Sequence, residues 1–487
     1  MDKHENPLSS APIEGKTFGP VIEVPRLERG ALKLVDIATS TMANIAPAMS
    51  FYFGFATIAA VTAAGIGSPL TIIAAIIAIA LLGNTLGEFS RSIPSTGSFI
   101  TFIGKTFGPV MAVTTTIVIS IGYIIAMASV IVISGGWTQI ILQHYFGINV
   151  PWQLLTFVFV VIVFFLLVRG VHLSTQWAGY FFLLEMIVLV LVSVVALVTN
   201  AGHLSLAPFN PANISGGLAG FGVAFPLAVY LFVGWENSAA LAEETDDPRH
   251  NVPRAIYASI ILMGLSYLLF SYSTIVAFNY NVNALSQAQV PFLTAAQKIS
   301  GILALFAYIA GFTSTMSAMI AGSNSQARLI FNAAREGLLP SALAKLHSKR
   351  RTPWASFLVF FGIGLGIVYI FGWTVEPVTF FGEIAALGTI LISVTYLVSN
   401  IALPVYYRRH HPDQFSWLKH LILPILGVLA IGFPLYALVQ PGQTAPFNLF
   451  PWIALGIIVV GLVYAIIISR IDPTLGDRVG SIVADRE

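Results

Sequence analysis

The sequence predicts an all-α integral membrane protein with twelve transmembrane helices, and three observations lead to this fold class. Of its 487 residues, 57% are hydrophobic and only 9% are charged, whereas a soluble domain carries about 25% charged residues. Apolar stretches long enough to cross a bilayer recur along the whole chain. The basic residues collect in alternate loops, as the positive-inside rule requires of a multi-pass protein. The lipid bilayer is therefore the predicted surrounding.

Composition also excludes several classes of function. The net charge of +2 gives no basic field for nucleic acid. The absence of cysteine rules out disulfides, thiol catalysis and thiolate metal sites. All nine histidines fall in the polar N-terminal tail or in segments predicted to be loops, so an intramembrane enzyme would lack its usual base or metal ligands. We expect no enzyme, no cofactor and no metal.

The twelve spans follow from the requirement of about 20 mostly apolar residues per crossing. No charged residue occurs between Lys105 and Arg169, and a polar break at 143–151 divides that stretch into two helices. The predicted spans are 34–63, 69–90, 110–139, 151–168, 176–199, 217–240, 254–279, 300–330, 353–372, 377–402, 417–440 and 448–469.

Loop charge predicts the orientation of these spans. With the N-terminus inside, every lysine and arginine except Lys298, 22 of 23, falls on the cytoplasmic side. The first 30 residues are polar and have no signal-peptide core. We therefore expect a multi-pass protein of the cell membrane with both termini cytoplasmic.

The first span is interrupted by its own sequence between Thr41 and Ala48. Pro47 lacks an N–H and frees a carbonyl one turn earlier, and Asn44 competes for local backbone hydrogen bonds. An ordinary proline kink, which is common in membrane helices, would explain this segment equally well.

The sixth span carries a matching interruption between Tyr230 and Glu236, where Gly234 lies between aromatic residues and precedes an acid. Paired interruptions at corresponding places in two halves of a chain indicate the substrate site of a transporter. Helices one and six are five spans apart, which fits two five-helix repeats followed by two further helices.

One carboxylate is predicted near the middle of the membrane. Glu185 lies about ten residues into span five, roughly 15 Å deep in a core of ~30 Å. A charge at that depth costs on the order of 2.5–3.5 kcal/mol, and no basic residue is predicted at similar depth. Glu185 suits reversible protonation, although a permanently protonated structural role remains open. Glu88 and Glu383 lie nearer helix ends and are interpreted as structural.

Two polar segments, 88–98 after span two and 243–256 after span six, are predicted on the cytoplasmic side. Their adjacent carboxylates and arginines are consistent with an inner gate or an ion-pair network between loops. Helix capping alone would also explain many of these residues.

Four motifs in this order resemble the amino acid–polyamine–organocation (APC) transporter superfamily over about residues 30–470. They are Glu-x5-Pro-x-x-Gly-Ser from Glu88 to Ser98, the aromatic-rich run from Tyr230 to Glu236, the stretch from Glu243 to Ile256, and the end of span eight from Ser323 to Pro340.

The resemblance implies a leucine-transporter-like fold with alternating access. It implies a cytoplasmic tail (1–33), a first repeat (34–199), a second repeat (200–402), helices 11 and 12 (403–470) and a second tail (471–487). It places substrate at the two interruptions, with Phe232 or Trp235 as an aromatic gate. The implied substrate-binding residues are Ala43, Asn44, Ile45, Ala46, Tyr230, Leu231, Phe232, Gly234, Trp235 and Glu236.

Two departures from the family pattern bear on coupling and substrate. Counted from Ser174, Glu185 occupies the helix-five position where family members often have a lysine tied to proton coupling. The family's Gly-Ser-Gly-type break is here Asn44 to Ala48, in which Pro47 removes an amide donor. This favours a cationic or amine-bearing substrate, with a neutral amino acid equally open.

The predicted function is proton-coupled transport of an amino acid or amine. Alternatives are substrate–product exchange of amino acids or polyamines, a channel, and a transporter-like nutrient sensor. Sodium coupling would use the weaker candidates Ser314, Thr315 and Ser317, but hydroxyls are common in membrane spans. The exact substrate and the oligomeric state do not follow from the sequence.

Overall fold

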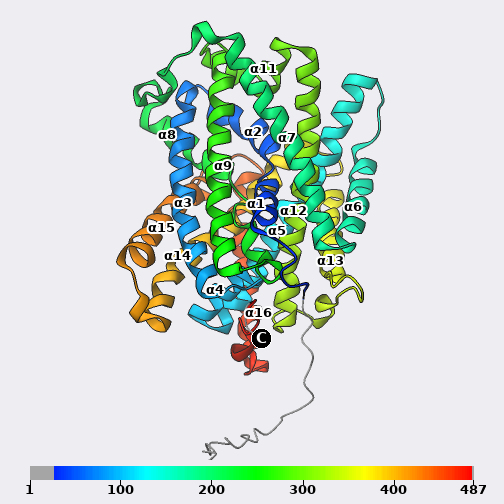
Figure 1. Ribbon diagram of the computed structural model, residues 1–487, viewed down its shortest axis with the longest axis vertical. Coiled ribbons are helices and arrows are strands. Elements are labelled where there is room, and N and C mark those ends of the chain that lie inside the picture. The colour runs from blue at the N-terminus through cyan, green and yellow to red at the C-terminus, as the bar shows by residue number, and fades with distance from the viewer. Residues whose placement is uncertain (1–26, 485–487) are drawn as a thin grey trace, which may run out of the picture.

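A computed structural model describes residues 27–484 as a bundle of helices. Most helices run along the longest axis of the molecule (Figure 1). Within the described residues, extended pairing is limited to an isolated bridge between Leu32 and Thr245. The predicted all-α class is therefore confirmed. Residues 1–26 of the predicted N-terminal tail and 485–487 of the C-terminal tail lie outside the described residues.

Among the described residues, nine helices are long and apolar enough to cross a membrane. Each coincides with one predicted span. They are α3 (Ser68–Ser92), α5 (Pro109–Phe146), α7 (Val171–Thr199), α9 (Pro248–Ala277), α12 (Gly301–Arg335), α13 (Trp354–Phe371), α14 (Pro377–His410), η8 with α15 (Leu418–Val439), and η9 with α16 (Phe447–Ile471).

The other three predicted spans fall on shorter helices. Predicted span 34–63 is divided into α1 (Leu34–Ile45) and α2 (Pro47–Ile58), and 151–168 corresponds to α6 (Trp152–Val168). Predicted span 217–240 forms an α-helix only in α8 (Gly217–Tyr230). After a turn, the chain continues in a 3₁₀ helix, η5 (Asn237–Glu244). Two of the three are short because the chain leaves helical geometry inside the apolar stretch.

Several long helices extend beyond their predicted ends. The 38 residues of α5 give a length of about 57 Å, well beyond a ~30 Å hydrocarbon core. Helical hydrogen bonding continues into the polar zone because it does not depend on hydropathy. The expectation that all histidines lie in loops or the tail is consequently wrong, because α5, α7, α9 and α14 contain His144, His172, His250 and His410. His420 lies within the predicted span 417–440 itself and is buried in η8.

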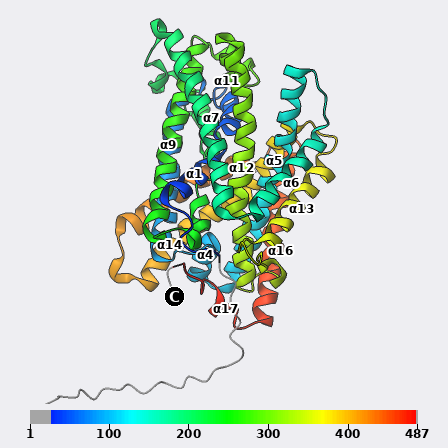
Figure 2. The same cartoon turned by 45° about the vertical axis from the view of Figure 1, so that its right-hand side comes forward.

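Exposed apolar side chains mark the outer surface of the bundle. Phe157 and Ile162 on α6, and Leu429 and Val460 on α15 and α16, are each about half exposed or more. In water such a surface would favour aggregation, whereas in a bilayer it is solvated by lipid chains. Helices α6 and α13 lie side by side at one edge of the bundle in both views (Figures 1 and 2).

The centre of the bundle is formed by α1, α2, α5, α7 and α12, and it positions the site. In Figure 1, α2 lies above α1 near the middle of the molecule. Helix α5 packs on both α12 and α14, and α7 packs on α12. Short helices close the ends, namely α4 (Ser98–Phe107), α10 (Val282–Gln287), α11 (Pro291–Ile299) and α17 (Leu475–Arg478).

The C-terminal segment that includes α17 folds back against one end of the bundle. Leu475 and Val479 are buried, and the Ala484 N–H donates to the Pro94 carbonyl at 2.8 Å. The Ser95 hydroxyl donates to the Ile482 carbonyl at 3.1 Å. This segment is therefore attached to the turn between α3 and α4.

Candidate functional site

The first helix separates into two helices at Ala46, which has a left-handed backbone with φ 54°. The Ala46 N–H donates to the Ala43 carbonyl, and the Ser50 hydroxyl donates to the Ile45 carbonyl at 2.7 Å. Pro47 occupies the first turn of α2, where its missing N–H removes no helical hydrogen bond. The segment is thus broken, and it is not merely kinked at the proline.

The sixth helix leaves helical geometry after Tyr230, and its break contacts the break in the first helix. Gly234 has φ 106°, and a Cβ there would lie 2.8 Å from Asn44 Nδ2. The Asn44 amide donates to the Gly234 carbonyl at 3.4 Å. A glycine is required here because both the backbone conformation and the close approach exclude a side chain.

A cavity of about 480 Å³ lies beside the two breaks. That volume falls in the range of ordinary small-molecule sites. Seven of the ten predicted substrate-binding residues line it: Asn44, Ile45, Ala46, Tyr230, Leu231, Gly234 and Glu236.

Ala43, Phe232 and Trp235 are almost fully buried and lie outside the lining of this cavity. The Phe232 ring packs edge-on against Tyr267, and the Trp235 ring packs against Tyr396. These contacts place both aromatic rings in the packing between helices rather than at the cavity wall.

Glu236 is the single charged side chain in the cavity lining. It is 4% exposed, its Oε1 accepts from the Tyr123 hydroxyl at 2.9 Å, and its Oε2 accepts from the Gly234 N–H at 3.1 Å. Glu236 therefore stabilises the turn of helix six while presenting a carboxylate to the cavity. No lysine, arginine or histidine of the described chain lines this cavity.

Two further polar atoms at the cavity have no partner among the described residues. The Tyr230 hydroxyl and the Gln326 Oε1 are both buried and make no hydrogen bond there. Leaving a buried polar atom unpaired costs about 1–3 kcal/mol. Such atoms at a cavity wall indicate where a bound molecule or water would be held.

Glu185 lies on α7 and is fully buried. Its Oε2 accepts from the Ala48 N–H at 3.2 Å, and its Oε1 accepts from the Ser317 hydroxyl at 3.0 Å. The carboxyl group thus joins the first turn of α2 to α12. No basic side chain of the described chain forms an ion pair with it.

The N-terminus of α2 has no backbone donor left for a ligand. Ala48 donates to Glu185, Met49 donates to the Ser314 hydroxyl at 3.3 Å, and Ser50 donates to the Ala46 carbonyl. A helix N-terminus ordinarily attracts an anion, but here the chain's own carboxyl group occupies that position. Of the three sodium candidates, only Thr315 lines the cavity. The Ser314 hydroxyl accepts from the Met49 N–H of α2, and the Ser317 hydroxyl donates to Glu185.

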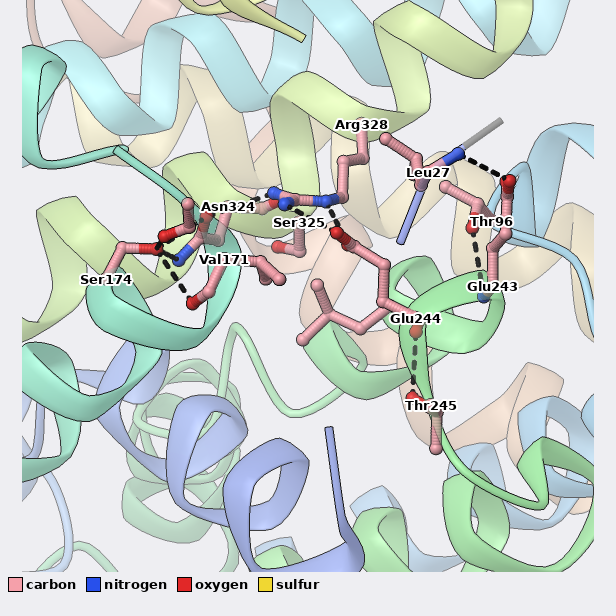
Figure 3. Close-up of polar contacts among 12 residues, drawn as sticks. Leu27, Thr96, Val171, Ser174, Glu243, Glu244, Thr245, Asn324, Ser325 and Arg328 are labelled. Carbon is pink, nitrogen blue, oxygen red and sulfur yellow. Dashed lines mark hydrogen bonds and ion pairs between the residues drawn. The ribbon is translucent and has the colours of Figure 1, made fainter. Parts of the chain in front are cut away.

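At the other end of η5, two buried carboxylates pair with arginines of α12, and Figure 3 shows the pair of Glu244 and Arg328. Glu244 accepts a bidentate pair from Arg328, and both side chains are at most 2% exposed. Glu243 accepts from Arg335 at 2.6 and 3.1 Å and also from the Leu27 N–H. The predicted network between charged segments therefore involves the end of span eight.

The neighbouring arginine of the polar segment has a different role. Arg249 donates to the carbonyls of Arg91 and Ser92, the latter at 3.1 Å. It thereby caps the C-terminal end of α3, as the capping interpretation anticipates.

Tyr123 and Gln326 both line the cavity, but neither is among the residues predicted to bind substrate. Tyr123 follows Gly122 in the middle of an uncharged span, and a phenol at that depth was an available signal. Nothing in the local sequence of Gln326 indicates that its side chain lines the cavity.

Fold and site together define a multi-pass membrane protein with a central cavity between two broken helices. A family model described as "Amino acid permease" matches residues 32–463. The chain belongs to the amino acid permease family, which confirms its resemblance to the APC superfamily.

Curated relatives agree with this assignment. The chain is 26% identical to the branched-chain amino acid permease BcaP of Bacillus subtilis over 81% of its length and 85% of the relative. It is 25% identical to the methylthioribose transporter of Bacillus subtilis over 82% and 86%. It is 24% identical to the cystine/glutamate transporter of Pongo abelii over 74% and 71%. These homologues are permeases and transporters, not enzymes.

Proposed function

We propose that this protein is a secondary active transporter that moves a small amine-bearing substrate across the cell membrane by alternating access, driven by protons. In this proposal twelve crossings form two inverted five-helix repeats and two further helices, with both termini cytoplasmic. The observation that carries the proposal is the contact between Glu185 and the N-terminus of α2.

Glu185 provides the physical basis for proton coupling. An uncompensated charge in the bilayer interior costs a few kcal/mol, and gaining a proton removes that cost. When ionised, the carboxylate holds α2 against α7 and α12 through charge-assisted hydrogen bonds, which are roughly twice as strong as neutral ones. Protonation weakens these bonds to Ala48 and Ser317. In the proposed transport cycle, protonation of Glu185 therefore releases α2 at the cavity wall.

The electrostatics of the cavity favour an amine over a free carboxylate. Glu236 supplies one acceptor for an ammonium group. Phe53, Tyr123 and Phe381 also line the cavity, and aromatic rings attract cations. A substrate carboxylate would meet no basic side chain of the lining and no free donor at α2. The remaining wall is mostly apolar and suits a hydrophobic body.

A neutral amino acid is the second candidate, and the name of the branched-chain permease of Bacillus subtilis favours it. Its carboxylate would have to displace Glu185 from Ala48, which protonation of Glu185 would facilitate. In that case the proton and the substrate would bind at adjoining positions.

Uptake by purified protein in liposomes tests the substrate class. We expect uptake of a primary alkyl or arylalkyl amine under an imposed pH gradient, and a loss of at least ten-fold in Glu236→Gln. Glu383→Gln is the matched control, since Glu383 lies outside the cavity lining. Uptake of neutral amino acids without any uptake of amines would contradict the amine proposal and support the second candidate.

A further inference from the structure

A second cavity, of about 680 Å³, lies at the polar end of the bundle. It is bounded by the C-terminal ends of α3 and α14, by η8, and by Gly480 and Val483 of the C-terminal segment. It has no lining residue in common with the central cavity. The loop charges predict that this end faces the cytoplasm.

The wall of this cavity is strongly basic. Glu88 is its single carboxylate, against four cationic side chains and three histidines. Glu88 pairs with Arg91, lies 3.8 Å from Lys419 and 3.2 Å from His420, and so cannot neutralise the wall. The cationic side chains are those of Arg91, Lys105, Arg249 and Lys419.

Part of this wall is held in place by the fold. His420 is 3% exposed, and its ring stacks on Tyr407 with centroids 3.6 Å apart. Arg249 is anchored on the last carbonyls of α3. Because the Arg249 guanidinium is fixed in this way, little conformational entropy is lost when an anion binds beside it.

An exposed apolar surface borders the cavity. The cavity is lined by Ser416, Lys419 and His420. Between them in the sequence, Trp417 and Leu418 are 65% and 56% exposed on the outside of the bundle. Ile422, one turn later, is 48% exposed. Tryptophan is enriched where a membrane protein meets the headgroup zone.

We propose that this cavity binds the phosphate of an anionic phospholipid headgroup, whose acyl chains lie along the surface formed by Trp417, Leu418 and Ile422. Basic pockets between helices on the cytoplasmic side are a recurring form of lipid recognition. The adjoining apolar surface distinguishes a lipid from a soluble phosphate. Because the C-terminal segment forms part of the wall, bound lipid would stabilise that segment against α3 and α4.

The test compares thermal stability of the purified full chain in neutral detergent with three probes: phosphatidylglycerol, phosphatidylcholine and inorganic phosphate. A ligand that binds the folded state raises the apparent Tm. We expect phosphatidylglycerol to raise it, and phosphatidylcholine and inorganic phosphate to leave it unchanged. Native mass spectrometry should show the bound phosphatidylglycerol.

Two variants locate the effect. Lys419→Gln removes a cation, and Gln414→Glu adds a carboxylate to the same wall without removing a hydrogen bond that the structure contains. Both should lose the Tm shift, whereas Lys345→Gln/Lys349→Gln, which removes charge from an exposed loop on the same face, should keep it.

Three results would overturn the proposal. The first is a full shift in both Lys419→Gln and Gln414→Glu. The second is an equal shift with phosphatidylcholine, which would mean a general lipid effect. The third is a full shift with inorganic phosphate alone, which would assign the cavity to a soluble anion.

Discussion

Glu336 illustrates at the scale of one residue how burial makes this fold sensitive to pH. It follows the last residue of α12, is 1% exposed, and accepts from the Asn332 amide at 3.2 Å. Burial raises the pKa of Glu336 from 4.5 to about 7, although hydrogen bonds from Gly480 and Asn332, and then the charges of Arg335 and Lys105, partly oppose the rise. The folded state therefore holds this proton more tightly than the unfolded chain does.

The sign of the effect on stability follows from linkage. A pKa raised in the folded state gives stability that is complete below the unfolded value and is lost as the pH rises through about 7. We expect the apparent Tm to fall between about pH 4.5 and pH 7, the unfolded and folded pKa values of Glu336, and Glu336→Gln to reduce that fall. The rise in the pKa of Glu336 corresponds to a loss of at most about 3 kcal/mol in the free energy of unfolding.

Scanning calorimetry or a fluorescence melt at several pH values measures this effect. Asp477→Asn, an exposed acid on the adjoining C-terminal segment, is the control and should retain the wild-type pH dependence. A Glu336→Gln variant with an unchanged pH profile would show that another group dominates.

Sequence and structure agree at the level of the helical elements and diverge in their internal geometry. Hydropathy places all nine long apolar helices because it reports the solvent that a helix must face. The proline in span one and the glycine in span six predict interruptions, because each residue opposes helical geometry in a known way. Local sequence thus locates both breaks.

Contacts between distant segments could not be predicted in the same way. That Asn44 bonds to the Gly234 carbonyl, and that Glu185 reaches Ala48, depends on how helices pack after the chain folds. The burial of His420 against Glu88 is a similar case. Composition shows that such residues are present, but it does not show which face of a helix they occupy.

The buried ion pair between Arg328 of α12 and Glu244 of η5 stabilises the packing of these two elements. Arg328→Ala would leave Glu244 buried without its partner, and breaking a buried ion pair costs about 3–5 kcal/mol. We expect a clear fall in apparent Tm. The double variant Arg328→Gln/Glu244→Gln removes both charges and should be more stable than Arg328→Ala alone.

Lys349→Ala, in the exposed loop after α12, is the control and should leave the Tm nearly unchanged. If Arg328→Ala melts like the wild type, or if the double variant is the less stable of the two, the pair does not contribute as the geometry indicates.

For the molecule as a whole, the polar groups of the two breaks and the carboxyl group of α7 form one connected arrangement. Glu236 holds the turn of helix six, Asn44 joins that turn to helix one, and Glu185 holds the second half of helix one. A change of charge at Glu185 can therefore alter the cavity wall without direct contact with substrate. The proposed proton-coupled cycle depends on this connection.

The most direct test is pH-driven uptake by Glu185→Gln in liposomes, with Glu383→Gln as a second carboxyl variant that keeps Glu185. Glutamine retains an oxygen that can accept from Ala48, so the protein should fold and bind substrate. We predict that Glu185→Gln loses the response of uptake to a pH gradient while Glu383→Gln keeps it. Uptake in Glu185→Gln that still follows the pH gradient, or wild-type uptake that requires sodium instead, would contradict the account.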